Sequence, residues 1–257
     1  MTHPFATQQI PFFLTASAPC PYLPDRMERK VFTRIEVGEG PALNDALTHA
    51  GFRRSQAVLY RPACEKCDAC RSSRIDVGNF NWKRRWRKIL SRNSDLRVST
   101  DAVGATLEQY ELLDRYLDSR HHDGDMAGMS FSEYVMMVED GAQRTHVTEY
   151  RDREGDLISA VLTDVLRDGI SMIYSFFDPE AERRSLGAYM ILDAIRQAEL
   201  AGLPFVYLGY WVRGSRKMAY KAEFQPLQVL TPAGWQPHAE LEFDDEDDID
   251  CNPQHDD

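Results

Sequence analysis

Several features are scarce or absent in this chain of 257 residues, and each narrows what the protein can be. No apolar run approaches the length of a membrane-spanning helix. The first twenty residues lack a charged n-region and are interrupted by prolines, so we expect no secretory signal and a cytoplasmic location. Cysteines number only five, an odd count that argues against a disulfide framework.

Positive charge is absent from the C-terminal end. From Ala239 onward the chain carries ten acidic residues and no Lys or Arg. Setting these ten aside leaves 31 acids against 30 bases, so the net charge of −11 belongs to the tail and the body is nearly neutral. We expect a disordered acidic tail over residues 237–257, most simply a solubilising one.

Acidic residues are absent from a different stretch, between Lys83 and Arg92. Residues 79–93 are predicted to form a helix whose inward face carries two tryptophans and two aliphatic residues. The outward face then carries a basic set that suits a polyanion, because neutralising phosphates releases counterions. An ordinary solvated helix face is the alternative. The candidate nucleic-acid contacts are Lys83, Arg84, Arg87 and Lys88.

The second half of the chain alternates strands and helices. Apolar residues recur at helical spacing over 186–200, Gly202 is positioned to end that helix, and strands are predicted at 170–177 and 205–208. This order predicts an α/β fold with a mixed sheet, in which the two strands lie parallel or splayed. We place an N-terminal domain at 1–98 and the second domain at 99–236.

The turn before the helix at 186–200 contains Arg183, Arg184 and Gly187. A helix N-terminus offers free N–H groups and a partial positive charge, which favours an anion such as phosphate. Acyl-donor-binding folds of the N-acetyltransferase type have the same arrangement. A solvated loop with two surface arginines explains the pattern equally well.

Cys64, Cys67 and Cys70 form two consecutive Cys-x-x-Cys steps, and Cys20 is the obvious fourth ligand. Four thiolates would suit zinc, and closely spaced cysteines are also typical of iron–sulfur clusters. Reduced thiols without a metal are the alternative. Cys251, in the acidic tail, is a poor candidate ligand.

Taken together, seven segments resemble one family, the bacterial aspartate/glutamate leucyltransferases, which are relatives of the arginyl-tRNA–protein transferases. The segments are Cys20-Pro-Tyr-Leu-Pro-Asp-Arg26, Tyr60-Arg-Pro-Ala-Cys-x-x-Cys-x-Ala-Cys70, the cluster Arg120, His121, Asp123, Gly124 and Met126, then Asp178-Pro, Arg183-Arg-Ser-Leu-Gly187, Tyr207-Leu-Gly-Tyr-Trp211 and Lys217-Met-Ala-Tyr-Lys221.

The resemblance implies a GNAT-like (N-acetyltransferase-like) catalytic half that takes leucine from leucyl-tRNA. It implies transfer of that leucine to an N-terminal Asp or Glu, which marks the acceptor protein for degradation through the N-degron pathway. Lys83, Arg84, Arg87 and Lys88 would then contact tRNA. No cofactor is expected for the transfer itself.

Several residues are candidates for the acceptor site and for catalysis. Lys217 and Lys221 are four apart on a predicted helix at 215–224 and, with Arg216, could bind the acceptor carboxylate. Tyr207, Tyr210 and Trp211 could line the site, although aromatics beside a strand usually form core, and Gly209 between them suggests a close backbone approach. Asp178 is the candidate proton acceptor, or an ordinary turn residue, and His121 contacts substrate or caps a helix.

Two functions from other classes remain open at this stage. An acyl-CoA-dependent N-acetyltransferase would explain the fold but neither the basic helix nor the cysteines. A non-catalytic, metal-stabilised RNA-binding module would explain those two features but not the basic turn at 183–187.

Overall fold

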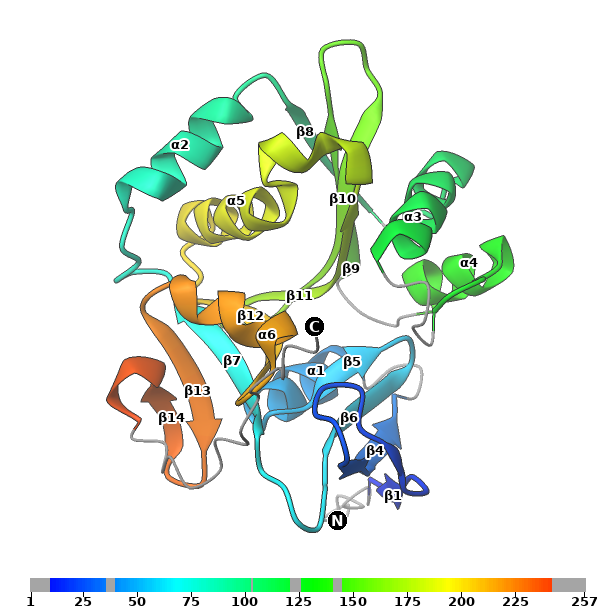
Figure 1. Ribbon diagram of the computed structural model, residues 1–257, viewed down its shortest axis with the longest axis vertical. Helices are drawn as coiled ribbons and strands as arrows, with labels where there is room; N and C mark the ends of the chain where they lie inside the picture. The colour runs from blue at the N-terminus through cyan, green and yellow to red at the C-terminus, as the bar shows by residue number, and fades with distance from the viewer. Residues whose placement is uncertain (1–9, 36–39, 103, 121–125, 141–144, 242–257) are drawn as a thin grey trace, which may run out of the picture.

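The computed structural model of the protein describes residues 10–35, 40–102, 104–120, 126–140 and 145–241 (Figure 1). Its framework is a mixed sheet of eight strands. In spatial order these are β14 (Gly234–Pro237), β13 (Leu227–Thr231), β7 (Cys70–Asp76), β12 (Phe205–Val212), β11 (Gly169–Phe177), β10 (Leu157–Val165), β9 (Thr145–Arg151) and β8 (Arg97–Ala102). Neighbouring strands are antiparallel except β11 and β12, which are parallel. The predicted mixed α/β fold is confirmed.

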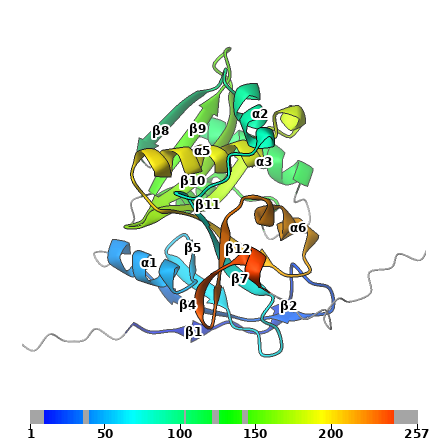
Figure 2. The same ribbon diagram turned by 90° about the vertical axis from the view of Figure 1, so that its left-hand side faces the viewer.

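Helices cover both faces of this sheet (Figures 1 and 2). α2 (Arg84–Arg92) and α5 (Leu186–Leu200) lie on one face, and α3 (Leu107–Arg120) and α4 (Phe131–Glu139) lie on the other. Because successive side chains of a strand point to opposite faces, Val161 packs in the core under α5, and Ala160 and Leu162 pack in the core under α3.

A smaller sheet is built from the N-terminal part of the chain. Its strands, in spatial order, are β1 (Phe13–Leu14), β4 (Lys30–Arg34), β6 (Val58–Pro62) and β5 (Arg53–Ser55), and it is accompanied by α1 (Gly40–His49) and the two-stranded pair β2 (Ala18–Pro19) and β3 (Met27–Glu28). Ile35, Phe52 and Leu59 form its own small core.

A buried ion pair holds the smaller sheet against the large one. Arg54 of β5 is 2% exposed, and its guanidinium donates to both carboxylate oxygens of Asp164 in β10, at 2.6 and 2.7 Å. Asn44 and Thr145 donate to the same carboxylate at 3.0 and 2.8 Å. The pair is therefore fully hydrogen-bonded, which a buried charge requires.

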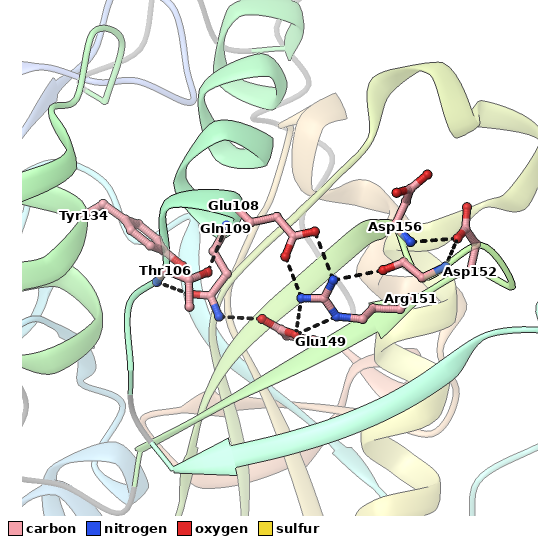
Figure 3. A network of polar contacts seen from close by, with 9 residues as sticks. Thr106, Glu108, Gln109, Tyr134, Glu149, Arg151, Asp152 and Asp156 are labelled. Atoms are coloured by element: carbon pink, nitrogen blue, oxygen red, sulfur yellow. Dashed lines mark hydrogen bonds and ion pairs between the residues drawn. The ribbon is translucent and has the colours of Figure 1, made fainter.

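A second polar network fixes α3 to the far end of the sheet (Figure 3). Arg151 of β9 donates to both oxygens of Glu108 at 2.9 and 2.7 Å and to Glu149 at 2.8 Å. Gln109 donates to the other Glu149 oxygen at 2.7 Å and accepts from Tyr134 of α4 at 2.9 Å. These charge-assisted bonds join α3 and α4 to β9.

The predicted helix at 186–200 is confirmed as α5, and its end has the predicted cause. Gly202 adopts φ +67°, the N–H of Leu203 donates to the carbonyl of Ala198 at 2.8 Å, and the N–H of Gly202 donates to Glu199 at 3.1 Å. This pair of bonds is the Schellman motif, in which a left-handed glycine satisfies the last free carbonyls.

The predicted continuous helix over 215–224 was wrong. The chain instead forms the four-residue α6 (Arg216–Ala219) and then a 3₁₀ segment, η2 (Tyr220–Glu223). The predicted boundary at residue 98 stays a prediction, although β7, which precedes it, pairs with β12 and β13 inside the large sheet. At the C-terminal end β14 includes Pro237 and is followed by η3 (His238–Glu240), so the prediction that disorder begins at residue 237 was wrong for residues 237–240. The acidic residues at 242–257 lie outside the described residues. In the described part of the chain, no helix is both long and apolar enough to span a membrane.

Candidate functional site

The two parallel strands β11 and β12 pair only where they begin. Gly169, Ile170 and Ser171 align with Phe205, Val206 and Tyr207, and the described residues show no further pairing between these strands. The predicted parallel or splayed arrangement is confirmed. β12 also has a bulge opposite β7 between Tyr207 and Gly209, where Gly209 has φ +71°. The divergence leaves backbone carbonyls that side chains must satisfy.

The basic turn lies directly after β11. Asp178 follows the last residue of the strand, and its carboxylate accepts the N–H of Glu180 at 2.9 Å, so it caps the 3₁₀ segment η1 (Pro179–Arg184). Ser185 then adopts φ +56° and α5 begins without a side-chain cap. Gly187, in its first turn, is partly exposed. Capping is thus the role the geometry gives Asp178, and its role as a proton acceptor stays a prediction.

The end of α2 braces this turn. Asn93 donates to the carbonyl of Arg184 at 2.9 Å, and Arg92 donates to the carbonyl of Arg183. Arg184 forms a two-pronged ion pair with Asp95, both bonds at 2.9 Å, and this bonding lowers the pKa of Asp95. Arg183 is exposed and has no carboxylate partner in the described residues. The basic helix and the basic turn, separate in sequence, therefore form one surface.

The outward face of α2 is as predicted. Trp86 is buried, and Trp82, Ile89 and Leu90 pack against the same core. The four candidate tRNA contacts, Lys83, Arg84, Arg87 and Lys88, are all exposed, and none of them has a carboxylate partner among the residues that the structure describes. The first turn of α2 contains no acid, so cations lie at the positive end of the helix dipole, where they destabilise the helix.

α2 is also connected to the segment that follows β12. Trp86 stacks on Phe224 with ring centroids 4.5 Å apart and an angle of 11°. Arg85 pairs with the Glu223 carboxylate at 2.7 Å and lies over the Trp86 ring. The basic helix therefore contacts the same segment that carries Lys221.

Lys217 and Lys221, predicted to share one face, are separated by the structure. Lys217 and Arg216 are exposed, whereas Lys221 is 4% exposed and donates to the carbonyls of Leu208 at 2.9 Å and Tyr210 at 2.5 Å. Burial, helped by the charge of Arg53, lowers the pKa of Lys221 to about 7. The two ammonium groups do not form a common exposed pocket.

Arg53 is a residue that sequence reasoning missed. It projects from β5 of the smaller sheet and donates to the carbonyl of Ile173 in β11. Its guanidinium lies against Gly209, where an added Cβ would be 2.3 Å from Nη1. The close approach predicted at Gly209 is confirmed, and Arg53 is what approaches. The signal available in the sequence was the pair of adjacent arginines, Arg53 and Arg54.

The three aromatic candidates are distributed among different surroundings. Tyr207 donates to Asp168 at 2.9 Å and accepts from Arg74 at 3.2 Å. The Tyr210 hydroxyl lies 3.1 and 2.9 Å from the carbonyls of Gly51 and Tyr60. Trp211 belongs to the core beneath α5 and contacts His238 edge-on. The structure does not bring the three together. His121 lies within 121–125, outside the described residues.

The cysteines line a cavity of about 210 Å³ beside β7. Cys20, Cys64, Cys67 and Cys70 all contribute to its wall, and none of the four is in a disulfide. Burial, and then the neighbouring cysteines, raise the pKa of Cys70 to about 12. Across the described residues, however, no three ligand side chains converge as they would around a metal ion. The metal therefore stays a prediction.

Comparisons with known proteins agree with this layout. Residues 18–88 match the family model "Arginine-tRNA-protein transferase, N terminus", and residues 108–231 match "Arginine-tRNA-protein transferase, C terminus". An aspartate/glutamate leucyltransferase of Maricaulis maris (strain MCS10) is 79% identical over 254 residues, covering 97% of this chain and 100% of the relative. One of Caulobacter vibrioides (strain NA1000 / CB15N) is 56% identical over 240 residues, covering 91% and 86%.

A solved tandem GNAT protein from the clavulanic acid biosynthesis pathway aligns over 82% of this chain and 59% of its own, with a TM-score of 0.42 and 12% identity. This similarity is too weak to support the assignment. The two family models and the relatives carry the assignment instead. The chain belongs to the arginine-tRNA–protein transferase family, alongside the aspartate/glutamate leucyltransferases.

Proposed function

We propose that this protein transfers leucine from leucyl-tRNA to the N-terminal Asp or Glu of acceptor proteins. The observation that carries the proposal is the 79% identity, over essentially the whole length of both chains, to a protein named aspartate/glutamate leucyltransferase. A charged tRNA donor agrees with a basic helix that lies beside a basic turn. Because charged tRNA is found in the cytoplasm, a cytoplasmic location stays our prediction.

The reaction is aminolysis of an ester. The acceptor's α-amine nitrogen attacks the leucyl carbonyl carbon, a C–N bond forms, and the ester C–O bond breaks. The amine loses a proton and the terminal ribose oxygen of the tRNA gains one, so no oxidant or further reactant is needed. An α-amine of pKa about 7.7–8.0 is partly neutral near pH 7. The enzyme can therefore act mainly by positioning two large substrates.

The donor tRNA would bind along α2 and the turn after β11. Lys83, Arg84, Arg87 and Lys88 offer four exposed charges, and Arg183 extends the same surface to the start of α5. A row of unpaired cations at the positive end of a helix is unfavourable for folding, which supports a binding role. Phosphates supply the missing counter-charge.

The cysteine cavity has the donor chemistry of a metal site but not its geometry. Four thiols suit zinc or an iron–sulfur cluster. Since no three ligand groups converge in the described ranges, no step of the transfer is assigned to a metal. Elemental analysis of anaerobically purified protein, with Cys64→Ser and Cys67→Ser variants as controls, tests whether a metal is bound.

The activity is tested by incubating the protein with labelled leucyl-tRNA or arginyl-tRNA and with peptides that begin with Asp, Glu or Lys. We expect leucine on the Asp and Glu peptides and none on the Lys peptide. Transfer of arginine alone would show that leucyl-tRNA is not the donor. Binding of tRNA without peptide-bond formation would favour an RNA-binding module, and consumption of acetyl-CoA would favour an N-acetyltransferase.

A further inference from the structure

Two cations meet where β11 and β12 diverge. Arg53 reaches this point from β5 and donates to the carbonyl of Ile173 on β11. Lys221 reaches it from η2 and donates to the carbonyls of Leu208 and Tyr210 on β12. Both side chains therefore end where the two strands separate, Arg53 against β11 and Lys221 against β12.

Neither cation has an acidic partner among the described residues, although a neighbour in sequence does. Arg54, the next residue of β5, is fully buried against Asp164, with bonds of 2.6 and 2.7 Å. Arg53 is half-buried and Lys221 is 4% exposed, yet neither forms an ion pair in the ranges that the structure covers. A buried charge without a counter-charge is costly, so such a pair needs a reason other than stability.

Three tyrosines lie within the electrostatic reach of Arg53, and two of them also line the cysteine cavity. The charge of Arg53 acts on Tyr22, Tyr174 and Tyr210, where it opposes the rise in pKa that burial causes. Tyr22 and Tyr210 also line the cavity of about 210 Å³. Arg53 is therefore close enough to these tyrosines for its charge to act on them, and Tyr22 and Tyr210 lie between Arg53 and the cavity, whose wall includes neither Arg53 nor Lys221.

We propose that Arg53 and Lys221 together bind the side-chain carboxylate of the acceptor's N-terminal Asp or Glu. The inference rests on the proposed leucyl transfer and gives its acceptor site a location. Arg53 is the new specificity-determining residue, and Arg216 and Lys217, which are exposed on α6, are not required.

The chemistry favours a carboxylate over a tRNA phosphate. A phosphodiester is flanked by sugars on both sides, whereas Lys221 is almost completely covered, so a ligand group that contacts it has to be small. Exposed cations for phosphate are already present on α2. A neutral acceptor side chain would leave Arg53 without a counter-charge and would give Lys221 no carboxylate to favour its protonation, so the site would reject Asn in favour of Asp.

The test compares the variants Arg53→Gln and Lys221→Met with Arg167→Gln, which removes an exposed cation in the turn between β10 and β11. For a peptide that begins with Asp we expect kcat/KM to fall about 10- to 100-fold in the first two variants, mainly through KM. The ratio of kcat/KM for Asp over Asn peptides should fall with it. Arg53→Lys should restore part of the loss, and the affinity for leucyl-tRNA should not change.

Equal losses for Asp and Asn peptides would overturn the proposal, because they would show that the two cations only brace the diverging strands. Weaker tRNA binding with an unchanged Asp/Asn ratio would also overturn it and assign the site to a donor phosphate. If no peptide receives leucine from the wild type, the proposed function itself fails.

A measurement on the wild type covers the case in which the variants do not fold. A peptide with an N-acetylated Asp has no amine to titrate. Its binding near pH 7.5 should be accompanied by proton uptake, measured by calorimetry in buffers of different ionisation enthalpy. Binding without proton uptake, or no binding, would contradict a carboxylate beside Lys221.

Discussion

The basic face of α2 yields a quantitative prediction about tRNA binding. Arg87 and Lys88 are exposed and, within the described residues, have no carboxylate partner, so changing both to Gln should leave the fold intact and remove two phosphate contacts. Trp86, between the basic residues, remains stacked on Phe224 and holds the helix in place.

The magnitude follows from the number of unpaired charges. Each neutralised phosphate makes the slope of log K against log salt steeper by about 0.7 to 0.9. Four such contacts, from Lys83, Arg84, Arg87 and Lys88, therefore contribute a slope of about 3 to 4. From 50 to 200 mM salt their contribution to affinity falls roughly 50- to 150-fold. For the double variant this fall should be only roughly 7- to 12-fold.

The assay is fluorescence anisotropy with labelled tRNA over a series of KCl concentrations. Arg115→Gln with Arg167→Gln is the matched control, since both residues are exposed cations away from α2. An α2 variant with the wild-type slope, or a control variant with an equally reduced slope, would refute the assignment of tRNA binding to this helix face.

Three further predictions concern the interior. Asp164→Asn leaves a buried guanidinium without its counter-charge and should lower the free energy of unfolding by about 3–5 kcal/mol in urea titrations. The pKa of Lys221 is lowered to about 7 in the folded protein, so between about pH 7 and the ordinary pKa of a lysine the unfolded chain binds more protons than the folded one. The free energy of unfolding of the wild type should therefore rise with pH over that window relative to that of Lys221→Met. A difference between the two proteins that does not change with pH would contradict this. Gly209→Ala places a Cβ 2.3 Å from Arg53, at a residue with φ +71°, and should raise KM for the Asp peptide. The matched variant Gly128→Ala also has φ +71° but lies in open space. It should lower the free energy of unfolding only by the backbone strain, roughly 1–2 kcal/mol, as measured by thermal unfolding.

Local patterns were sufficient to predict most of the fold. The helix at 186–200, its glycine stop and the inward face of α2 follow from helical spacing, because an apolar stripe must face the core. The parallel pairing of β11 and β12 follows from strand, helix and strand in sequence. These features depend on neighbours within one or two turns.

The site depends on contacts between distant segments, which no local pattern contains. Alternation places Arg53 and Arg54 on opposite faces of β5, but nothing local shows that Arg54 meets Asp164, 110 residues away, while Arg53 meets Ile173. Helical spacing placed Lys217 and Lys221 together, yet the chain tightens into a 3₁₀ segment there and turns Lys221 into the divergence of the strands.

The most direct test of leucyl transfer is a single-turnover experiment with tRNA that carries labelled leucine and an Asp-led peptide. The proposed reaction requires the label to appear on the peptide's α-amine at the rate at which uncharged tRNA is released. Label that remains on tRNA, or appears only as free leucine, would contradict transfer to the acceptor.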